Sequence, residues 1–128
     1  MPLTRALIVE DETVVRVDIE TQLRNAGYVI AGSATSGEEA IVKARTLRPD
    51  IILMDITLRG RMDGFTAARL IRQEASIPIV FVSAQTTFES MSNCDRPIFR
   101  VDKPFTNKGL LEAVAAAVAT LRRRQQMT

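Results

Sequence analysis

Five side chains that could do chemistry follow the ends of short apolar runs in the sequence: Glu10, Asp11, Asp55, Ser83 and Lys103. An acidic residue directly after a buried run costs several kcal/mol unless it is paired, so Asp55 in particular indicates a site. If the runs are parallel strands of one sheet, ligands bind outside their carboxyl ends. The five side chains are therefore expected to converge at one edge of that sheet.

The chemistry of such a cluster follows from its charge. Two carboxylates about 4 Å apart repel by about 4 kcal/mol at an effective dielectric constant near 20. A cation, a lysine or protonation must relieve that repulsion. The chain has no histidine and one cysteine, Cys94, so an all-oxygen ligand set suits a hard divalent ion such as Mg²⁺. An aspartate beside a metal, a lysine and a hydroxyl suits phosphoryl transfer, in which the carboxylate attacks.

Most of these residues also have an ordinary structural interpretation. Asp11 or Glu12 alone could cap a helix or complement the dipole of its first turn. Ser83 could be the hydroxyl of a local turn, and Lys103 could be a surface lysine. The prediction of a site therefore depends on their occurrence, in order, at the ends of separate strands.

Hydrophobic periodicity predicts the elements that position these residues. Continuous apolar runs predict five strands, at 6–9, 28–34, 51–56, 77–83 and 97–101. Apolar residues at helical spacing lie between the runs and predict about five helices. Ser36 and Glu39 have the form of a capping box, which predicts a helix that runs to about Leu47. The stretch 84–96 is polar and a weak helix former, so we expect a short or mobile fourth helix. The last helix is expected over 106–124.

The alternation of strands and helices predicts an α/β fold. Each crossover would be a right-handed helix, which gives a doubly wound parallel sheet with helices on both faces. The 128 residues fit one domain, with its core at about 4–121 and a basic C-terminal tail at 122–128. No apolar stretch approaches the roughly 20 residues of a membrane span. No secretion signal precedes the first strand, so a cytoplasmic protein is expected.

Composition excludes several classes of function. Without histidine, the chain cannot form His-based zinc sites or Ser-His-Asp triads. The formal net charge is only +2, and no recognition helix or aromatic platform is evident, so neither nucleic acid nor membrane is expected as a partner.

Several motifs carry a resemblance to a known family: "LIVEDE", "IILMDI", "MDG", "VFVSA" and "DKPF". On these, residues 4–121 resemble a receiver domain of response regulators, the CheY-like domain of bacterial two-component signalling. The resemblance implies a flavodoxin-like five-stranded sheet of strand order 2-1-3-4-5. It also implies that Asp55 is the phosphoacceptor, which receives a phosphoryl group from a phosphohistidine of a sensor histidine kinase.

The same resemblance assigns roles to the other site residues. Mg²⁺ would be held by Glu10, Asp11, Asp55 and the backbone carbonyl of Thr57. Ser83 would donate a hydrogen bond to a phosphoryl oxygen, and Lys103 would pair with the phosphoryl group. A cis peptide bond is implied between Lys103 and Pro104.

The switch position departs from the family pattern. Receivers usually carry Tyr or Phe three residues before the lysine, but this chain has Arg100 there, with Phe99 beside it. Because an arginine cannot bury as a ring does, we expect an atypical switch that involves Ser83, Arg100 and Phe99.

The leading hypothesis is a stand-alone receiver, not an enzyme, that is a monomer or weak dimer. Its partners would be a sensor histidine kinase or phosphotransfer protein and an unknown downstream protein. Two alternatives stay open: a phosphorylation-independent adaptor, and the receiver part of a longer regulator. A haloacid-dehalogenase-like phosphatase is disfavoured because Thr57 stands where its second aspartate would be. An FMN binder is disfavoured because the acids at 10–12 would repel the phosphate.

Overall fold

The computed structural model describes residues 3–58, 60–83 and 99–127, with five parallel strands in the order β2-β1-β3-β4-β5. The strands are β1 (Arg5–Val9), β2 (Val29–Ala34), β3 (Ile51–Asp55), β4 (Ile79–Ser83) and β5 (Phe99–Asp102). The helices of the described residues are α1 (Thr13–Asn25), α2 (Gly37–Leu47), α3 (Gly64–Glu74) and α4 (Asn107–Met127). The predicted doubly wound sheet and its strand order are confirmed. The helix predicted within 84–96 lies outside the described residues.

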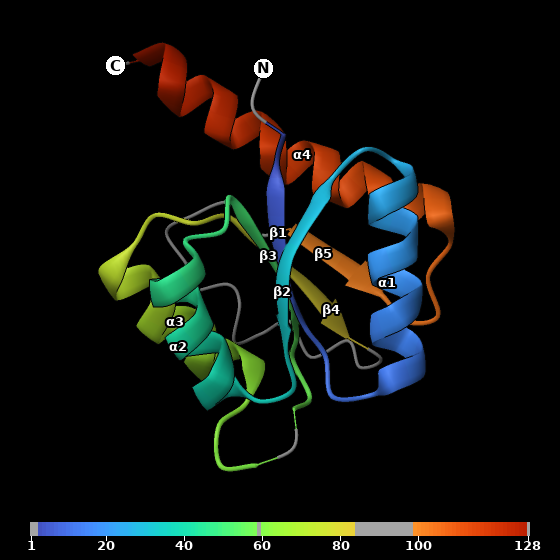
Figure 1. Ribbon diagram of the computed structural model, residues 1–128, viewed down its shortest axis with the longest axis vertical. Helices are drawn as coiled ribbons and strands as arrows, with labels where there is room; N and C mark the ends of the chain where they lie inside the picture. The colour runs from blue at the N-terminus through green and yellow to red at the C-terminus, as the bar shows by residue number, and fades with distance from the viewer. Residues whose placement is uncertain (1–2, 59, 84–98, 128) are drawn as a thin grey trace.

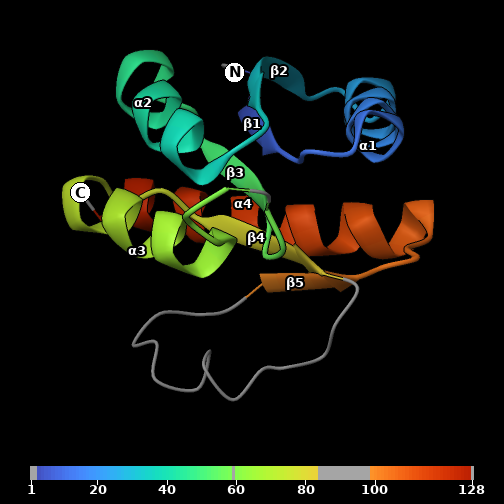
Figure 2. The ribbon, with the colours of Figure 1, turned by 90° about the horizontal axis from the view of Figure 1, so that it is seen from below.

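Helices cover both faces of the sheet: α2 and α3 lie on one side, and α1 and α4 on the other (Figures 1 and 2). Each side has its own apolar cluster, one with Leu7, Ile52 and Phe81, the other with Ile8 and Leu53. Every residue of β3 and β4 is buried. Continuous apolar runs are what strands with both faces covered require.

The start of α2 confirms Ser36 as the N-cap of the predicted capping box. The Ser36 hydroxyl accepts a hydrogen bond from the Glu39 N–H at 3.1 Å. The Glu39 carboxylate reaches back one residue further than expected and accepts from the Thr35 N–H at 2.7 Å. Two N–H groups at this end of the helix are thereby satisfied by side chains.

A glycine fixes the approach of α3 to the end of β3. A Cβ on Gly64 would lie 2.1 Å from the Asp55 carbonyl oxygen, a distance that no side chain can tolerate. The Gly64 N–H donates to the Ile56 carbonyl at 2.9 Å, and the Asp63 carboxylate caps the helix by accepting from the Thr66 N–H. The start of α3 is therefore packed directly on the backbone of Asp55.

Several predicted element ends differ by one residue from those of the described chain, and two differ by more. β4 begins at Ile79 and not at Ile77, because Pro78 has no N–H to donate, although its carbonyl accepts from Ile52. α4 continues to Met127, so its backbone includes most of the segment expected as a basic tail. None of the helices within the described residues combines the length and apolar character that a membrane crossing needs.

Candidate functional site

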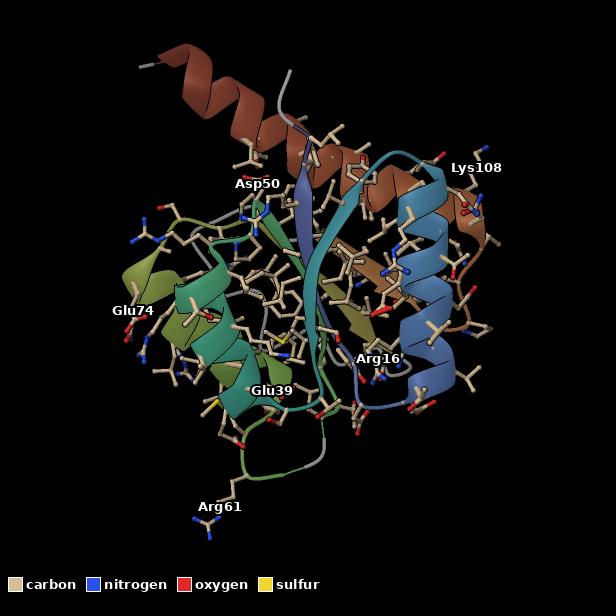
Figure 3. The ribbon with its side chains drawn as sticks, viewed as in Figure 1. Arg16, Glu39, Asp50, Arg61, Glu74 and Lys108 are labelled. Atoms are coloured by element: carbon tan, nitrogen blue, oxygen red, sulfur yellow. The ribbon has the colours of Figure 1, made fainter. Side chains whose placement is uncertain are left out.

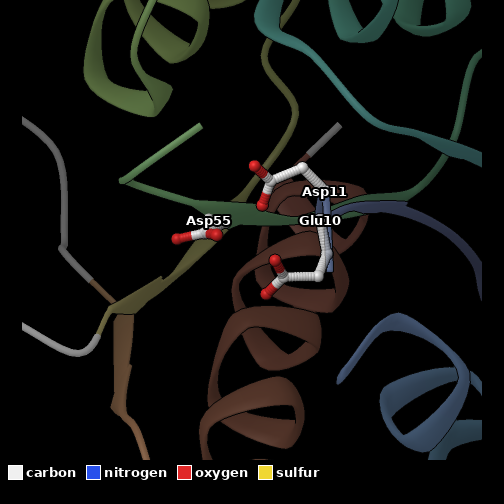
Figure 4. A group of neighbouring side chains, drawn as sticks. All are labelled: Glu10, Asp11 and Asp55. Atoms are coloured by element: carbon white, nitrogen blue, oxygen red, sulfur yellow. The ribbon is translucent and has the colours of Figure 1, made fainter. Parts of the chain in front are cut away.

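Three carboxylates meet at the carboxyl edge of the sheet. Glu10 and Asp11 follow β1, whose Val9 is paired with Met54 of β3, and Asp55 is the next residue of β3. One oxygen from each carboxylate lies within 4.8 Å of the others. Figure 4 shows the three side chains around a common space. The predicted convergence is thus present in the structure.

A lysine from the far side of the sheet reaches this cluster. Lys103 follows β5, and its Nζ lies 2.6 Å from Glu10 Oε1 and 3.4 Å from Asp55 Oδ2. The Lys103 backbone N–H donates to the Ser83 carbonyl at 2.8 Å, which ties the segment to β4. The peptide bond to Pro104 is cis, as the resemblance implies.

The two carboxylates nearest Lys103 are held in the same way. Glu10 uses its other oxygen, Oε2, to accept from the Glu12 N–H at 3.1 Å. Asp55 uses Oδ1 to accept from the Thr57 N–H at 3.0 Å. In each case one oxygen binds a backbone N–H two residues along the chain and the other faces the ammonium, so both side chains have fixed orientations.

Burial makes this cluster electrostatically unusual. Glu10 is 1% exposed and Asp55 3% exposed. Burial raises the pKa of Glu10 from 4.5 to about 7; the hydrogen bond to Lys103 opposes this rise and the neighbouring Asp55 adds to it. Burial lowers the pKa of Lys103, but its hydrogen bond to Glu10 and the charge of Asp55 outweigh that effect and leave it raised. The lysine therefore stays charged at neutral pH.

The structure also places the residues expected at the switch. Ser83 ends β4, is buried, and lies opposite Asp102 in the strand register. Arg100 is paired in register with Phe81, and its guanidinium lies 3.8 Å from the Asp102 carboxylate. Phe99 instead packs with the cluster on the α1 and α4 side. The two neighbouring residues of β5 thus belong to opposite faces of the sheet.

The structure does not support a capping hydrogen bond from the Glu12 side chain. Glu12 occupies the N-cap position of α1, but within the described chain its side chain makes no capping hydrogen bond. Sequence reasoning also missed Arg16, whose Nη1 donates to the Glu10 carbonyl at 3.3 Å. An arginine in the first turn of a helix carries no pattern that would reveal this contact.

The donor set fits a hard divalent cation. Three carboxylates can each supply one oxygen, and the described part of the chain offers no softer ligand beside them. Small, highly charged ions of this kind bind carboxylates and carbonyls. A cation would also favour the charged form of Glu10, whose pKa is raised mainly by burial and further by the neighbouring Asp55.

Comparisons with known proteins show the family of this chain. The response regulator receiver domain matches residues 6–115. PdtaR, a transcriptional regulatory protein of Mycobacterium tuberculosis, is 36% identical over 121 residues, which are 92% of this chain and 58% of PdtaR. The chemotaxis protein CheY of Thermotoga maritima is 38% identical over 81 residues, 62% of this chain and 67% of CheY.

A solved structure shows the same fold. The signal receiver domain of a modulated diguanylate cyclase from Desulfovibrio desulfuricans G20 has a TM-score of 0.85 and 31% identity, and covers 96% of this chain and 99% of its own. The match of the family over most of the sequence, together with this likeness, is decisive. The chain belongs to the response regulator receiver domains, the CheY-like signalling domains of two-component systems.

Proposed function

We propose that Asp55 accepts a phosphoryl group, in a Mg²⁺-dependent reaction, from the phosphohistidine of a sensor histidine kinase or phosphotransfer protein. The observation that carries this proposal is the position of the buried Asp55 carboxylate, with Lys103 Nζ 3.4 Å from one oxygen and two further acids beside it. A nucleophile next to fixed positive charge is the arrangement that phosphoryl transfer requires.

The transfer forms one bond and breaks another. A carboxylate oxygen of Asp55 attacks phosphorus, the P–N bond of the donor breaks, and the imidazole leaves with the electron pair and takes up a proton. The Lys103 ammonium, which contacts Glu10 and Asp55 before the transfer, would pair with the phosphoryl oxygens afterwards. The buried Ser83 hydroxyl would donate to another of these oxygens. The product is a mixed anhydride with about two negative charges.

The metal would be held by the carboxylates of Glu10, Asp11 and Asp55 and by the backbone carbonyl of Thr57. When bound, Mg²⁺ neutralises negative charge on the transferred group. The hydrogen bond from the Thr57 N–H to Asp55 supports this assignment, because it fixes the turn that carries the carbonyl. Glu10 contributes as the buried ligand that must lose its proton to bind the ion.

Phosphorylation would be read out as altered protein–protein interaction around β5. Arg100 replaces the usual ring and pairs with Asp102, the residue next to Lys103. A charged side chain there supports an atypical switch, in which the Arg100–Asp102 pair and Phe99 rearrange in place of an inward-swinging ring. A beryllofluoride-bound spectrum in which the Arg100 side-chain signals do not shift would contradict this part of the proposal.

The chain would act as a signalling domain without enzymatic activity toward other substrates, as a monomer or weak dimer. It spans 58% of the length of PdtaR. That ratio favours a second candidate besides a stand-alone regulator: the same receiver, residues 1–128, within a longer protein. In both cases the partners would be proteins.

The decisive experiment is labelling with acetyl phosphate in the presence of Mg²⁺. The wild-type protein is expected to gain one phosphoryl group, and Asp55→Asn to gain none. Asp63→Asn is a matched control, because it removes a nearby carboxylate while asparagine still caps α3. Intact mass spectrometry and phosphate-affinity gels measure the outcome. Labelling that survives in Asp55→Asn, or that needs no metal, would refute the proposal.

A further inference from the structure

The Glu10 peptide is held from both sides at the carboxyl end of β1. Its N–H donates to the Ala34 carbonyl of β2 at 3.0 Å. Its carbonyl oxygen accepts from Arg16 Nη1 at 3.3 Å. With the backbone anchored on two sides, the Cα–Cβ direction of Glu10 is fixed toward the acidic cluster.

The guanidinium that makes this contact is itself oriented. Arg16 Nε lies 4.0 Å from Glu20 Oε1, one turn further along α1, and the two side chains are 19% and 14% exposed. The Arg16 backbone N–H also donates to the Glu12 carbonyl at 2.9 Å. Arg16 therefore connects the first turns of α1 to the acid-bearing segment (Figure 3).

We infer that Arg16 is a positioning residue for divalent cation binding, acting through the Glu10 backbone. This inference rests on the proposed function, because it concerns the same metal site. Ligating carboxylates need support from groups beyond the ligands, and loss of such support typically weakens metal binding by about 10- to 100-fold. Arg16 itself contributes no oxygen and would not contact the ion.

The direction in which Mg²⁺ affinity changes when Arg16 is replaced distinguishes a positioning role from a simple charge effect. Arg16 carries a positive charge close to a site for a cation, so its removal should tighten metal binding if charge alone matters. If Arg16 acts by holding Glu10 in place, its removal should weaken binding instead. The two explanations predict opposite changes in the Mg²⁺ dissociation constant.

The test measures Mg²⁺ affinity by isothermal titration calorimetry for the wild type, Arg16→Met and Arg24→Met. Methionine keeps most of the aliphatic stem. Arg24 is an exposed arginine in the last turn of the same helix, so its variant has the same charge change far from the site. We expect Arg16→Met to bind Mg²⁺ about tenfold more weakly, and Arg24→Met to bind like the wild type.

A second readout separates positioning from catalysis. In acetyl phosphate labelling, Arg16→Met should need more Mg²⁺ for half-maximal rate while its rate at saturating Mg²⁺ stays close to that of the wild type. Should Arg16→Met not fold, Arg16→Lys serves: its single ammonium replaces the planar guanidinium, and a Mg²⁺ affinity below that of the wild type is expected.

The outcomes distinguish this inference from the proposed function. If the wild type binds Mg²⁺ and is labelled, but Arg16→Met (or, where that variant is unfolded, Arg16→Lys) binds Mg²⁺ as tightly or more tightly, the role of Arg16 is wrong and the function stands. If the wild type shows neither binding nor labelling, the proposed function itself fails, and this inference with it.

Discussion

The two edges of the sheet treat charge in opposite ways. At the amino edge, where the parallel strands begin and the helices end, charged groups are paired with an opposite charge or with backbone groups. The Asp50 carboxylate accepts from the Arg5 N–H at 2.8 Å, and Arg45 and Glu74 form a two-pronged ion pair with contacts of 2.7 and 2.6 Å. At the carboxyl edge, within the described residues, three carboxylates lie together and the Lys103 ammonium contacts two of them, Glu10 and Asp55.

The amino edge uses its charge for structure. The Arg5 guanidinium donates to the carbonyls of Leu47 and Arg48, at 2.8 and 3.1 Å. These groups lie at the end of α2, where the last carbonyls of a helix lack partners within the helix. Charge here supplies hydrogen bonds that the helix end needs.

The carboxyl edge keeps an imbalance that lowers stability. A buried Glu10 with a pKa near 7 is a carboxylate that would be more favourably placed in water. Such cost is expected where a site is built to bind a charged ligand, because the ligand and not the protein completes the balance. At the amino edge, hydrogen-bonded charge supports the end of a helix, whereas at the carboxyl edge two buried acids, Glu10 and Asp55, share the single ammonium of Lys103.

The largest effect on stability is expected when Lys103 is replaced. Lys103→Met leaves Glu10 and Asp55 buried without their cation, and we expect the free energy of unfolding of the metal-free protein at pH 8 to fall by about 3 kcal/mol. Urea denaturation measures it. Lys108→Met is the control, since that side chain is 86% exposed. An equal loss at pH 5 and pH 8 would point to lost packing of the aliphatic chain instead of charge.

A pH titration of stability tests the Glu10 imbalance directly. Since the folded pKa of about 7 exceeds the ordinary 4.5, the folded state binds more protons between these values. The contribution of protonated Glu10 to the free energy of unfolding is complete below pH 4.5 and is lost as pH rises through 7. We expect Glu10 to contribute a decline of about 3 kcal/mol across this window.

Glu10→Gln should flatten this decline in the metal-free protein. Glu112→Gln, with a side chain 67% exposed, should not. Denaturant midpoints at intervals of pH provide the measurement. A Glu10→Gln profile as steep as that of the wild type would assign the decline to other groups.

A substitution at the amino edge should lower the free energy of unfolding by an amount that depends on neither pH nor metal. Arg5→Met removes two hydrogen bonds from the end of α2, and we expect a loss of about 1 kcal/mol in unfolding free energy. The loss should be the same at pH 5 and pH 8 and with or without Mg²⁺. Amide exchange in the last turn of α2 would report its location. A loss that Mg²⁺ reverses would mean that the two edges are coupled.

The smallest effect is expected at the Arg45–Glu74 pair. Both side chains are exposed, 58% and 47%, and exposed ion pairs contribute little because solvent and salt screen them. Arg45→Met should leave the Tm unchanged within error at physiological ionic strength. A clear drop in Tm would show that exposure alone does not separate structural from incidental pairs.

Much of the fold could be predicted because each signal was local. Continuous apolar runs such as 51–54 are typical of strands buried on both faces, and the Ser36 capping box marked the start of α2. The errors were local too: Pro78 shortened β4, and α4 ran beyond the helix predicted to end at 124. Helix and strand ends depend on a balance of single hydrogen bonds that the pattern does not resolve.

The convergence of Glu10, Asp11 and Asp55 at one edge was also predictable, because parallel strands bring their carboxyl ends together. Which side chains stand at that edge follows from the order of residues alone, since apolar periodicity and strand direction are properties of the chain. Two contacts could be learned from the folded structure alone. The Lys103 ammonium lies closer to the Glu10 carboxylate, 93 residues away in the chain, than to the Asp55 carboxylate, and Arg16 binds the Glu10 backbone. Pairing, burial and the resulting pKa depend on distances between segments that meet only when the sheet is assembled, and no local pattern encodes those distances.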